Sequence, residues 1–153
     1  GSLLAFLLPT VFQTFMKENP EKVTSQWLPS PTGSDEQATI LLMNKENQMA
    51  TVALSMHSKQ PKRAMISGEK AYIEIMEFPR ASNAVIVDAI TGERKEIVEG
   101  ETANALFYEM SDMEKAVLTG DESIMKLPFS VDVMNIMTNL RKQWQMKYPD
   151  EEW

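Results

Sequence analysis

The sequence of 153 residues predicts an α+β fold, with an open, mainly antiparallel or mixed sheet of about seven strands and helices packed on one of its faces. Three features predict it. Apolar and polar side chains alternate over residues 71–76, and an apolar run over residues 84–89 indicates a second strand. Gly92, between that run and residues 95–98, supplies the turn of an antiparallel hairpin. After Gly100 the spacing of apolar residues becomes that of a helix.

Residues 1–18 are apolar, and a buried helix is expected there. Pro9 and Gln13 interrupt the apolar run, whereas a membrane-spanning helix needs about 20 predominantly apolar residues, and a signal peptide would carry a basic start and a cleavage site. The helix ends at Pro20, because the residue before a proline is pushed out of the α region. A first strand follows over residues 22–27.

The next two strands are expected to pair as a hairpin. Apolar runs over residues 38–43 and 49–56 flank a polar loop with asparagines that can adopt the left-handed conformation. Residues 58–62 then turn the chain into the strands that begin at residue 63, and residues 67–70 form another turn.

Two amphipathic helices are expected in the C-terminal part. The first follows Gly100 and stops at Gly120, since glycine suits the position after a helix C-terminus. The second begins after Pro128, with Ser130 as its N-cap. Their apolar stripes comprise Leu106, Phe107, Met110, Met113 and Val117 in the first helix, and Val133, Ile136, Met137, Leu140 and Trp144 in the second.

Length and composition narrow the class of protein. Residues 1–153 fit a single domain that can bury a substantial core. The chain has no cysteine, which excludes disulfides and thiolate chemistry and suits a cytoplasmic location. His57 is the one histidine, which excludes histidine-rich metal sites. The net charge of −7 opposes the phosphate backbone, so we do not expect nucleic acid as a partner.

The uncovered face of the predicted sheet requires an explanation. Strand residues are apolar on both parities, as where Ile40 and Leu42 alternate with Leu41 and Met43. A second apolar face would be a large exposed patch, and such patches usually mark association surfaces. We therefore expect a homodimer that forms through the open sheet face. The alternative is a non-catalytic protein-interaction module that uses the same face to bind a different protein.

The sequence contains no complete catalytic constellation and predicts no cofactor or metal site. Arg80, beside Pro79 at a strand end, could clamp an anionic or hydroxylated ligand, although turn arginines more commonly make surface ion pairs. His57 follows a strand end and could transfer a proton if a cleft and a partner surround it, although a surface histidine is more common. These two residues are the candidates for contact with a ligand.

A set of short motifs extends over nearly the whole chain. It comprises Gly1-Ser2-Leu3-Leu4, Pro20-Glu21-Lys22-Val23, Gly68-Glu69-Lys70-Ala71-Tyr72-Ile73, Phe78-Pro79-Arg80-Ala81, Glu101 with residues 104–110, Gly120 with Glu122-Ser123 and Pro128, and Met134 with Arg141-Lys142-Gln143-Trp144 and Tyr148-Pro149. In these residues the chain resembles the C-terminal domain of the glucose–fructose oxidoreductase, inositol dehydrogenase and MocA (Gfo/Idh/MocA) family of NAD(P)-dependent oxidoreductases.

The resemblance implies a parent enzyme of two domains. In this family an N-terminal Rossmann domain binds NAD or NADP and carries the catalytic lysine, whereas the α+β domain supplies the substrate wall and the oligomer interface. This chain is therefore expected to bind no cofactor by itself. It would be the substrate-binding and oligomerisation domain of a dehydrogenase that acts on a sugar, polyol or dihydrodiol, and it would be inactive as an isolated fragment. We expect a further segment to precede Gly1 in the parent.

Two positions depart from the family pattern. An Asp typically follows the opening G-x-L-L motif, and a His or Tyr one helical turn later assists proton transfer at the substrate hydroxyl. Here Ala5 stands at the first position and Leu8 or Pro9 at the second. Because none of these side chains can transfer a proton, the resemblance implies either another proton path or a non-catalytic parent.

Overall fold

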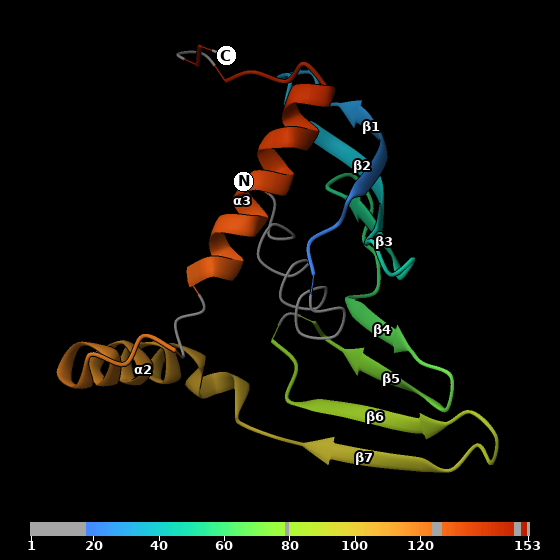
Figure 1. Cartoon of the computed structure of the whole chain (residues 1–153), viewed down its shortest axis with the longest axis vertical. Helices are drawn as coiled ribbons and strands as arrows, with labels where there is room; N and C mark the ends of the chain where they lie inside the picture. Colours follow the sequence, from blue (N-terminus) through green and yellow to red (C-terminus); the bar gives the residue numbers. More distant parts are fainter. Residues whose placement is uncertain (1–17, 79, 124–126, 149–150, 153) are drawn as a thin grey trace. The chain divides into compact units, whose positions relative to one another are not determined.

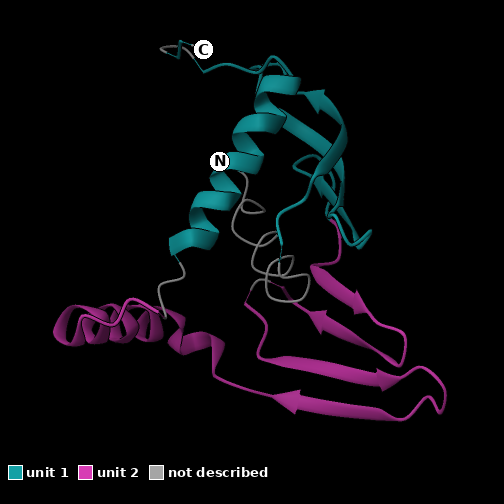
Figure 2. Cartoon of the chain, viewed as in Figure 1, with its two compact units in different colours: residues 1–59, 126–153 teal, residues 60–125 magenta. Residues whose placement is uncertain are grey.

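A computed structural model gives the structure of the protein and describes residues 18–78, 80–123, 127–148 and 151–152. The chain divides into two compact units (Figure 2). Unit 1 combines residues 1–59 with residues 126–153, and unit 2 comprises residues 60–125. The helix expected over residues 1–18 lies almost entirely outside the described residues.

Unit 1 contains an antiparallel sheet in the order β1-β2-β3. Its strands are β1 (Lys22–Pro29), β2 (Asp35–Met43) and β3 (Met49–Ser55). The loop between β2 and β3 is closed by Asn44, whose Nδ2 donates to Gln48 Oε1 (2.8 Å) and whose Oδ1 accepts from the Gln48 backbone N–H (2.9 Å). Asn47 takes the left-handed conformation (φ 60°), as the sequence predicted for this loop.

One face of this sheet is covered by helix α3 (Leu127–Gln143; Figure 1). The buried cluster comprises Ile40, Leu42, Val52 and Leu140, so that three residues from the sheet meet one from the helix. Beyond the helix end, the Trp144 ring stacks on Trp27 with ring centroids 5.1 Å apart, and its Nε1 donates to Ser25 Oγ (2.8 Å). The predicted apolar stripe of this helix is therefore its packing face.

The start of α3 corrects the sequence prediction. The helix begins at Leu127, so Pro128 lies in its first turn and Ser130 is helical; the assignment of Ser130 as the N-cap is wrong. A proline fits the first helical turn because the backbone N–H groups there have no intrahelical acceptor, and its fixed φ is already helical.

The opposite face of the unit 1 sheet carries few charges. The cross-strand pairs place these side chains in four rungs: Lys22, Met43 and Met49; Thr24, Leu41 and Thr51; Gln26, Thr39 and Ala53; and Leu28, Gln37 and Ser55. Lys22 is the only charged residue in these rungs. Apart from Lys22, the rungs are uncharged, but they are not uniformly apolar, because threonine and glutamine alternate with Leu41 and Leu28.

Unit 2 contains a second antiparallel sheet in the order β4-β5-β6-β7, followed by two helical segments. In the hairpin between β6 and β7, Gly92 has φ 71°, as predicted, and Asp88 Oδ1 accepts from the backbone N–H groups of Ile90 (2.9 Å) and Thr91 (2.7 Å). Gly120 ends the last helix with φ 71°, which is also as predicted. The elements are β4 (Arg63–Ser67), β5 (Ala71–Met76), β6 (Asn83–Asp88), β7 (Arg94–Val98), η2 (Thr102–Asn104) and α2 (Ala105–Thr119).

The α+β class, the antiparallel pairing and the seven strands are confirmed, but the strands pair in two sheets of three and four where a single open sheet was expected. Between β3 and β4 the chain runs through residues 56–62, which include Pro61. A proline has no N–H to donate to a ladder, so this stretch separates the strand runs. No helix among the described residues is long and apolar enough to cross a membrane.

Burial of Leu140 predicts a large loss of stability on truncation. Leu140 is 3% exposed within the core cluster, whereas Met134 on the same helix is 58% exposed. We expect Leu140→Ala to lower the free energy of unfolding by about 2–5 kcal/mol through lost burial and a residual cavity. The matched variant Met134→Ala should stay within about 0.5 kcal/mol of the parent. Urea denaturation followed by tryptophan fluorescence measures both, and equal losses would contradict this packing.

The turn at Asp88 predicts a pH-dependent contribution to stability. Hydrogen bonds from the Thr91 and Ile90 backbone N–H groups hold the pKa of Asp88 below its ordinary value of 3.8. A lowered pKa means that the stabilisation is complete well above 3.8 and is lost as the pH falls below this value towards the folded-state pKa. Asp88→Asn should therefore lower the Tm at neutral pH, and its difference from the parent should vanish in acid. A Tm difference that is constant with pH would contradict this assignment.

Candidate functional site

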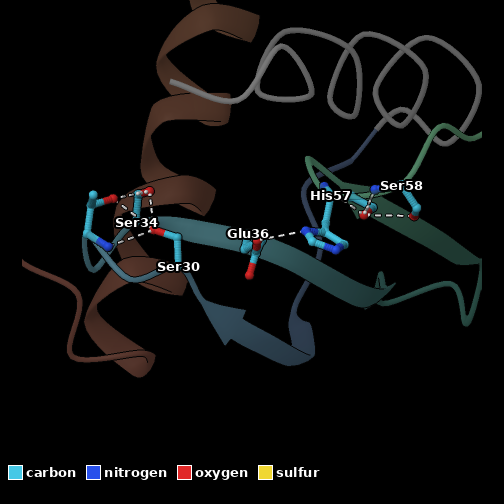
Figure 3. Close-up of polar contacts among 7 residues, drawn as sticks. Ser30, Ser34, Glu36, His57 and Ser58 are labelled. Carbon is cyan, nitrogen blue, oxygen red and sulfur yellow. Dashed lines mark hydrogen bonds and ion pairs between the residues drawn. The ribbon is translucent and has the colours of Figure 1, made fainter.

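The single histidine lies beyond the end of β3 in unit 1, beside a glutamate from β2. His57 Nδ1 is 3.2 Å from Glu36 Oε1 (Figure 3). The two residues meet because the Met56 N–H donates to the Glu36 carbonyl oxygen (2.8 Å), which extends the ladder between β2 and β3. The imidazole side chain is 74% exposed, whereas that of Glu36 is 24% exposed.

A serine turn fixes the backbone that carries this histidine. Ser55 Oγ accepts hydrogen bonds from the backbone N–H groups of His57 (3.2 Å) and Ser58 (3.0 Å), and from Ser58 Oγ (2.9 Å; Figure 3). The Glu36 carboxylate lies at ion-pair distance from Nδ1, so Nε2 is the ring nitrogen left for contact with a ligand. The pair can thus supply one hydrogen bond or one proton to a ligand.

A second group of hydroxyls in Figure 3 lies in the turn between β1 and β2. Ser30 Oγ is 2.9 Å from Ser34 Oγ and 2.8 Å from Thr32 Oγ1. Gly33 in the same turn has φ 85°. These side chains bond to one another, so their arrangement accounts for the turn and points to no ligand.

Arg80 lies in unit 2, in the turn that joins β5 to β6. Its backbone N–H donates to the Glu77 carbonyl oxygen (3.1 Å), and its own carbonyl oxygen accepts from Thr102 Oγ1 (2.8 Å). Glu77 has φ 54°, a left-handed conformation that is uncommon for a residue with a Cβ. The Arg80 side chain is exposed, and among the described residues its guanidinium makes no hydrogen bond or ion pair.

The two predicted ligand-contact residues belong to different units, His57 to unit 1 and Arg80 to unit 2. Ala5, Leu8, Pro9 and Pro79 lie outside the described residues. In the described ranges, no three His, Cys, Asp or Glu side chains are grouped in a way that could hold a metal ion.

The structure adds two residues that the sequence reasoning missed. Glu36 could have been found from the hairpin register, because pairing Met43 with Met49 and counting along the ladder places Glu36 opposite Met56. Thr102 gives no such signal. A hydroxyl that bonds to a carbonyl oxygen in another loop leaves no periodic pattern in the sequence.

Comparison with known proteins identifies oxidoreductases. No family model matches the chain. Its sequence is 27% identical to a trans-1,2-dihydrobenzene-1,2-diol dehydrogenase of Xenopus tropicalis, over 97% of this chain and 48% of that protein. A protein of the same name from Xenopus laevis is 26% identical, over 97% of this chain and 48% of its own length. The chain thus spans about half the length of the curated relatives that it matches.

Solved structures share the fold. Aldose-aldose oxidoreductase from Caulobacter crescentus has a TM-score of 0.69 at 14% identity, over 90% of this chain and 42% of that one. UDP-N-acetylglucosamine 3-dehydrogenase GnnA from Acidithiobacillus ferrooxidans has a TM-score of 0.63 at 15% identity, over 76% of this chain and 38% of that one. The chain therefore shares its fold with part of each of these two proteins. The predicted resemblance is confirmed: the chain is similar to the C-terminal half of Gfo/Idh/MocA-type oxidoreductases.

Proposed function

We propose that this chain is the C-terminal substrate-binding and oligomerisation domain of an NAD(P)-dependent oxidoreductase that acts on a sugar, polyol or dihydrodiol. The observation that carries the proposal is the alignment of 97% of the chain with 48% of a dihydrodiol dehydrogenase. The fold shared with aldose-aldose oxidoreductase supports it. In this proposal the dinucleotide-binding and catalytic groups belong to the other half of a parent protein.

Each of the two candidate ligand contacts has, within its own unit, chemistry suited to such a substrate. The Arg80 guanidinium donates hydrogen bonds and carries a positive charge, and the pair of His57 and Glu36 can exchange a proton with a hydroxyl. NAD or NADP would be bound by the parent and not by this chain. A cytoplasmic location is consistent with the absence of cysteine.

We further propose that the chain forms a homodimer through the face of the unit 1 sheet that α3 does not cover. The inner two rungs of this face, which contain Leu41 and Thr39, carry no charged side chain. Burying uncharged side chains against a second copy avoids the desolvation of charges that opposes association. A solvated face of an antiparallel sheet would normally carry more charged residues.

The proposed interface predicts that a charge at its centre disrupts the dimer. Leu41 is 38% exposed and lies between Thr24 and Thr51. In Leu41→Glu, two carboxylates would be buried against the partner, so we expect the dimer dissociation constant to rise at least tenfold, by roughly 1.4 kcal/mol or more. Sedimentation velocity over a concentration series measures it.

The matched control is Met134→Glu, which adds the same charge at an exposed position on α3 and should leave the dimer intact. Circular dichroism verifies that both variants fold. A parent chain that stays monomeric at all concentrations, or a Leu41→Glu variant as dimeric as the parent, would refute the interface and favour an interaction module that binds a foreign protein.

Because the proposal places the dinucleotide-binding and catalytic groups in the other half of a parent protein, it predicts that the purified chain is inactive with nicotinamide cofactors. It should neither enhance NADH or NADPH fluorescence nor reduce NAD or NADP with glucose, inositol or a dihydrodiol as substrate. A complete dehydrogenase under the same conditions is the positive control. Detectable dinucleotide binding or turnover by the 153-residue chain would contradict the proposal.

A further inference from the structure

The turn that carries Arg80 is fastened to the segment that follows β7. Thr102 Oγ1 donates to the Arg80 carbonyl oxygen at 2.8 Å, and the Glu99 N–H donates to the Ser82 carbonyl oxygen at 2.9 Å. The second bond continues the pairing of Asn83 with Val98 by one residue beyond the strands. The backbone on the C-terminal side of Arg80 is therefore held at two points.

The segment that holds this turn is itself anchored to α2. Gly100 has φ 73°, and a Cβ at this position would lie 3.9 Å from Tyr108 Cε2. The Glu101 N–H donates to Tyr108 Oη (3.2 Å), and Glu101 Oε1 accepts from the Ala103 N–H (3.4 Å). Thr102 is thus the first residue of the short helix η2, and the residue before it, Glu101, is hydrogen-bonded to Tyr108 in α2.

On its N-terminal side, the Arg80 turn contains strained backbone. Glu77 has φ 54° without being glycine, asparagine or aspartate, and its carbonyl oxygen accepts from the Arg80 N–H (3.1 Å). Strain of this kind persists where the surrounding contacts enforce it, and it is concentrated at ligand-binding positions. Arg80 is therefore hydrogen-bonded through its backbone to Glu77 on one side and to Thr102 on the other.

The N–H donors of the Arg80 guanidinium are exposed and available to a ligand. Arg94 in the same unit pairs with Glu74 (2.7 Å), but within the described part of the chain Arg80 has no carboxylate or carbonyl partner for its side chain. Five N–H donors in a planar fork match the two oxygens of a carboxylate or phosphate. A fixed backbone lowers the entropy that such binding costs.

We propose that Arg80 binds the carboxylate or phosphate group of an anionic sugar or polyol derivative, and that Thr102 is a positioning residue that fixes the Arg80 backbone. The inference rests on the proposed function and narrows its substrate class. The positioning role requires the hydroxyl of Thr102 and not merely the size of its side chain, because this hydroxyl donates the hydrogen bond to the Arg80 carbonyl oxygen.

The test is a titration of the isotope-labelled 153-residue chain, followed by amide NMR shifts, with D-gluconate, D-glucose 6-phosphate and neutral D-glucose. We expect saturable shifts around Arg80 and residues 99–104 with at least one anion and none with glucose. Saturation by gluconate alone assigns a carboxylate, saturation by the phosphate alone assigns a phosphate, and saturation by both assigns recognition of the shared charge.

Four variants complete the test. Arg80→Gln should weaken anion binding at least tenfold, whereas Arg63→Gln, which removes an exposed arginine from β4, should leave it unchanged. Thr102→Val should weaken binding roughly three- to tenfold, and Thr102→Ser, which keeps the hydroxyl, should stay within about twofold. Circular dichroism verifies the fold of each variant.

Three results would overturn the inference: no saturable shifts with either anion, equal losses in Arg63→Gln and Arg80→Gln, or equal losses in Thr102→Val and Thr102→Ser. Its failure is distinguishable from failure of the proposed function. A dimer that binds neither dinucleotide nor anion retains the proposed function and loses only the anionic substrate class, whereas dinucleotide binding by the chain removes the proposed function itself.

Discussion

The packing of α3 on the sheet of β1, β2 and β3 is the constraint on which unit 1 depends. Leu140 enters the cluster of Ile40, Leu42 and Val52, and the stacked rings of Trp27 and Trp144 extend the contact past the helix end. In the sequence, the whole of unit 2 lies between this sheet and α3. Closing so long a loop is tolerable because its entropic cost grows only logarithmically, by about 0.6 kcal/mol per doubling.

Because α3 covers one face, it also determines what the other face can do. The strand period of two sends Ile40 and Leu42 to the helix and Thr39 and Leu41 to the opposite side, and slipping the register by one residue would exchange them. Register is fixed locally by the Asn44 and Gln48 contacts in the loop between β2 and β3. The same local contacts therefore define both the core and the sparsely charged opposite face.

What the sequence predicts well is local. The hairpin turn at Gly92, the left-handed residue in the loop after β2 and the stop at Gly120 each depend on the conformational freedom of one residue, and all were predicted. The grouping of seven strands into two sheets was not, because periodicity identifies strands but not their neighbours. The start of α3 was misplaced because a proline can belong to a first helical turn as readily as precede it. The candidate residues His57 and Arg80 were identified by type, but their partners Glu36 and Thr102 required coordinates.

The two candidate residues are held in different ways, which separates what each can contribute. The His57 backbone is held by Ser55, and the Glu36 carboxylate lies 3.2 Å from Nδ1, so the exposed ring has a charged neighbour on one side. Arg80 is constrained only through its backbone, by Glu77 and Thr102, and its long side chain keeps its rotameric freedom. A proton transfer needs defined geometry, whereas an anion can draw a mobile guanidinium to itself. We therefore propose directional hydrogen bonding as the role of His57 and charge recognition as the role of Arg80.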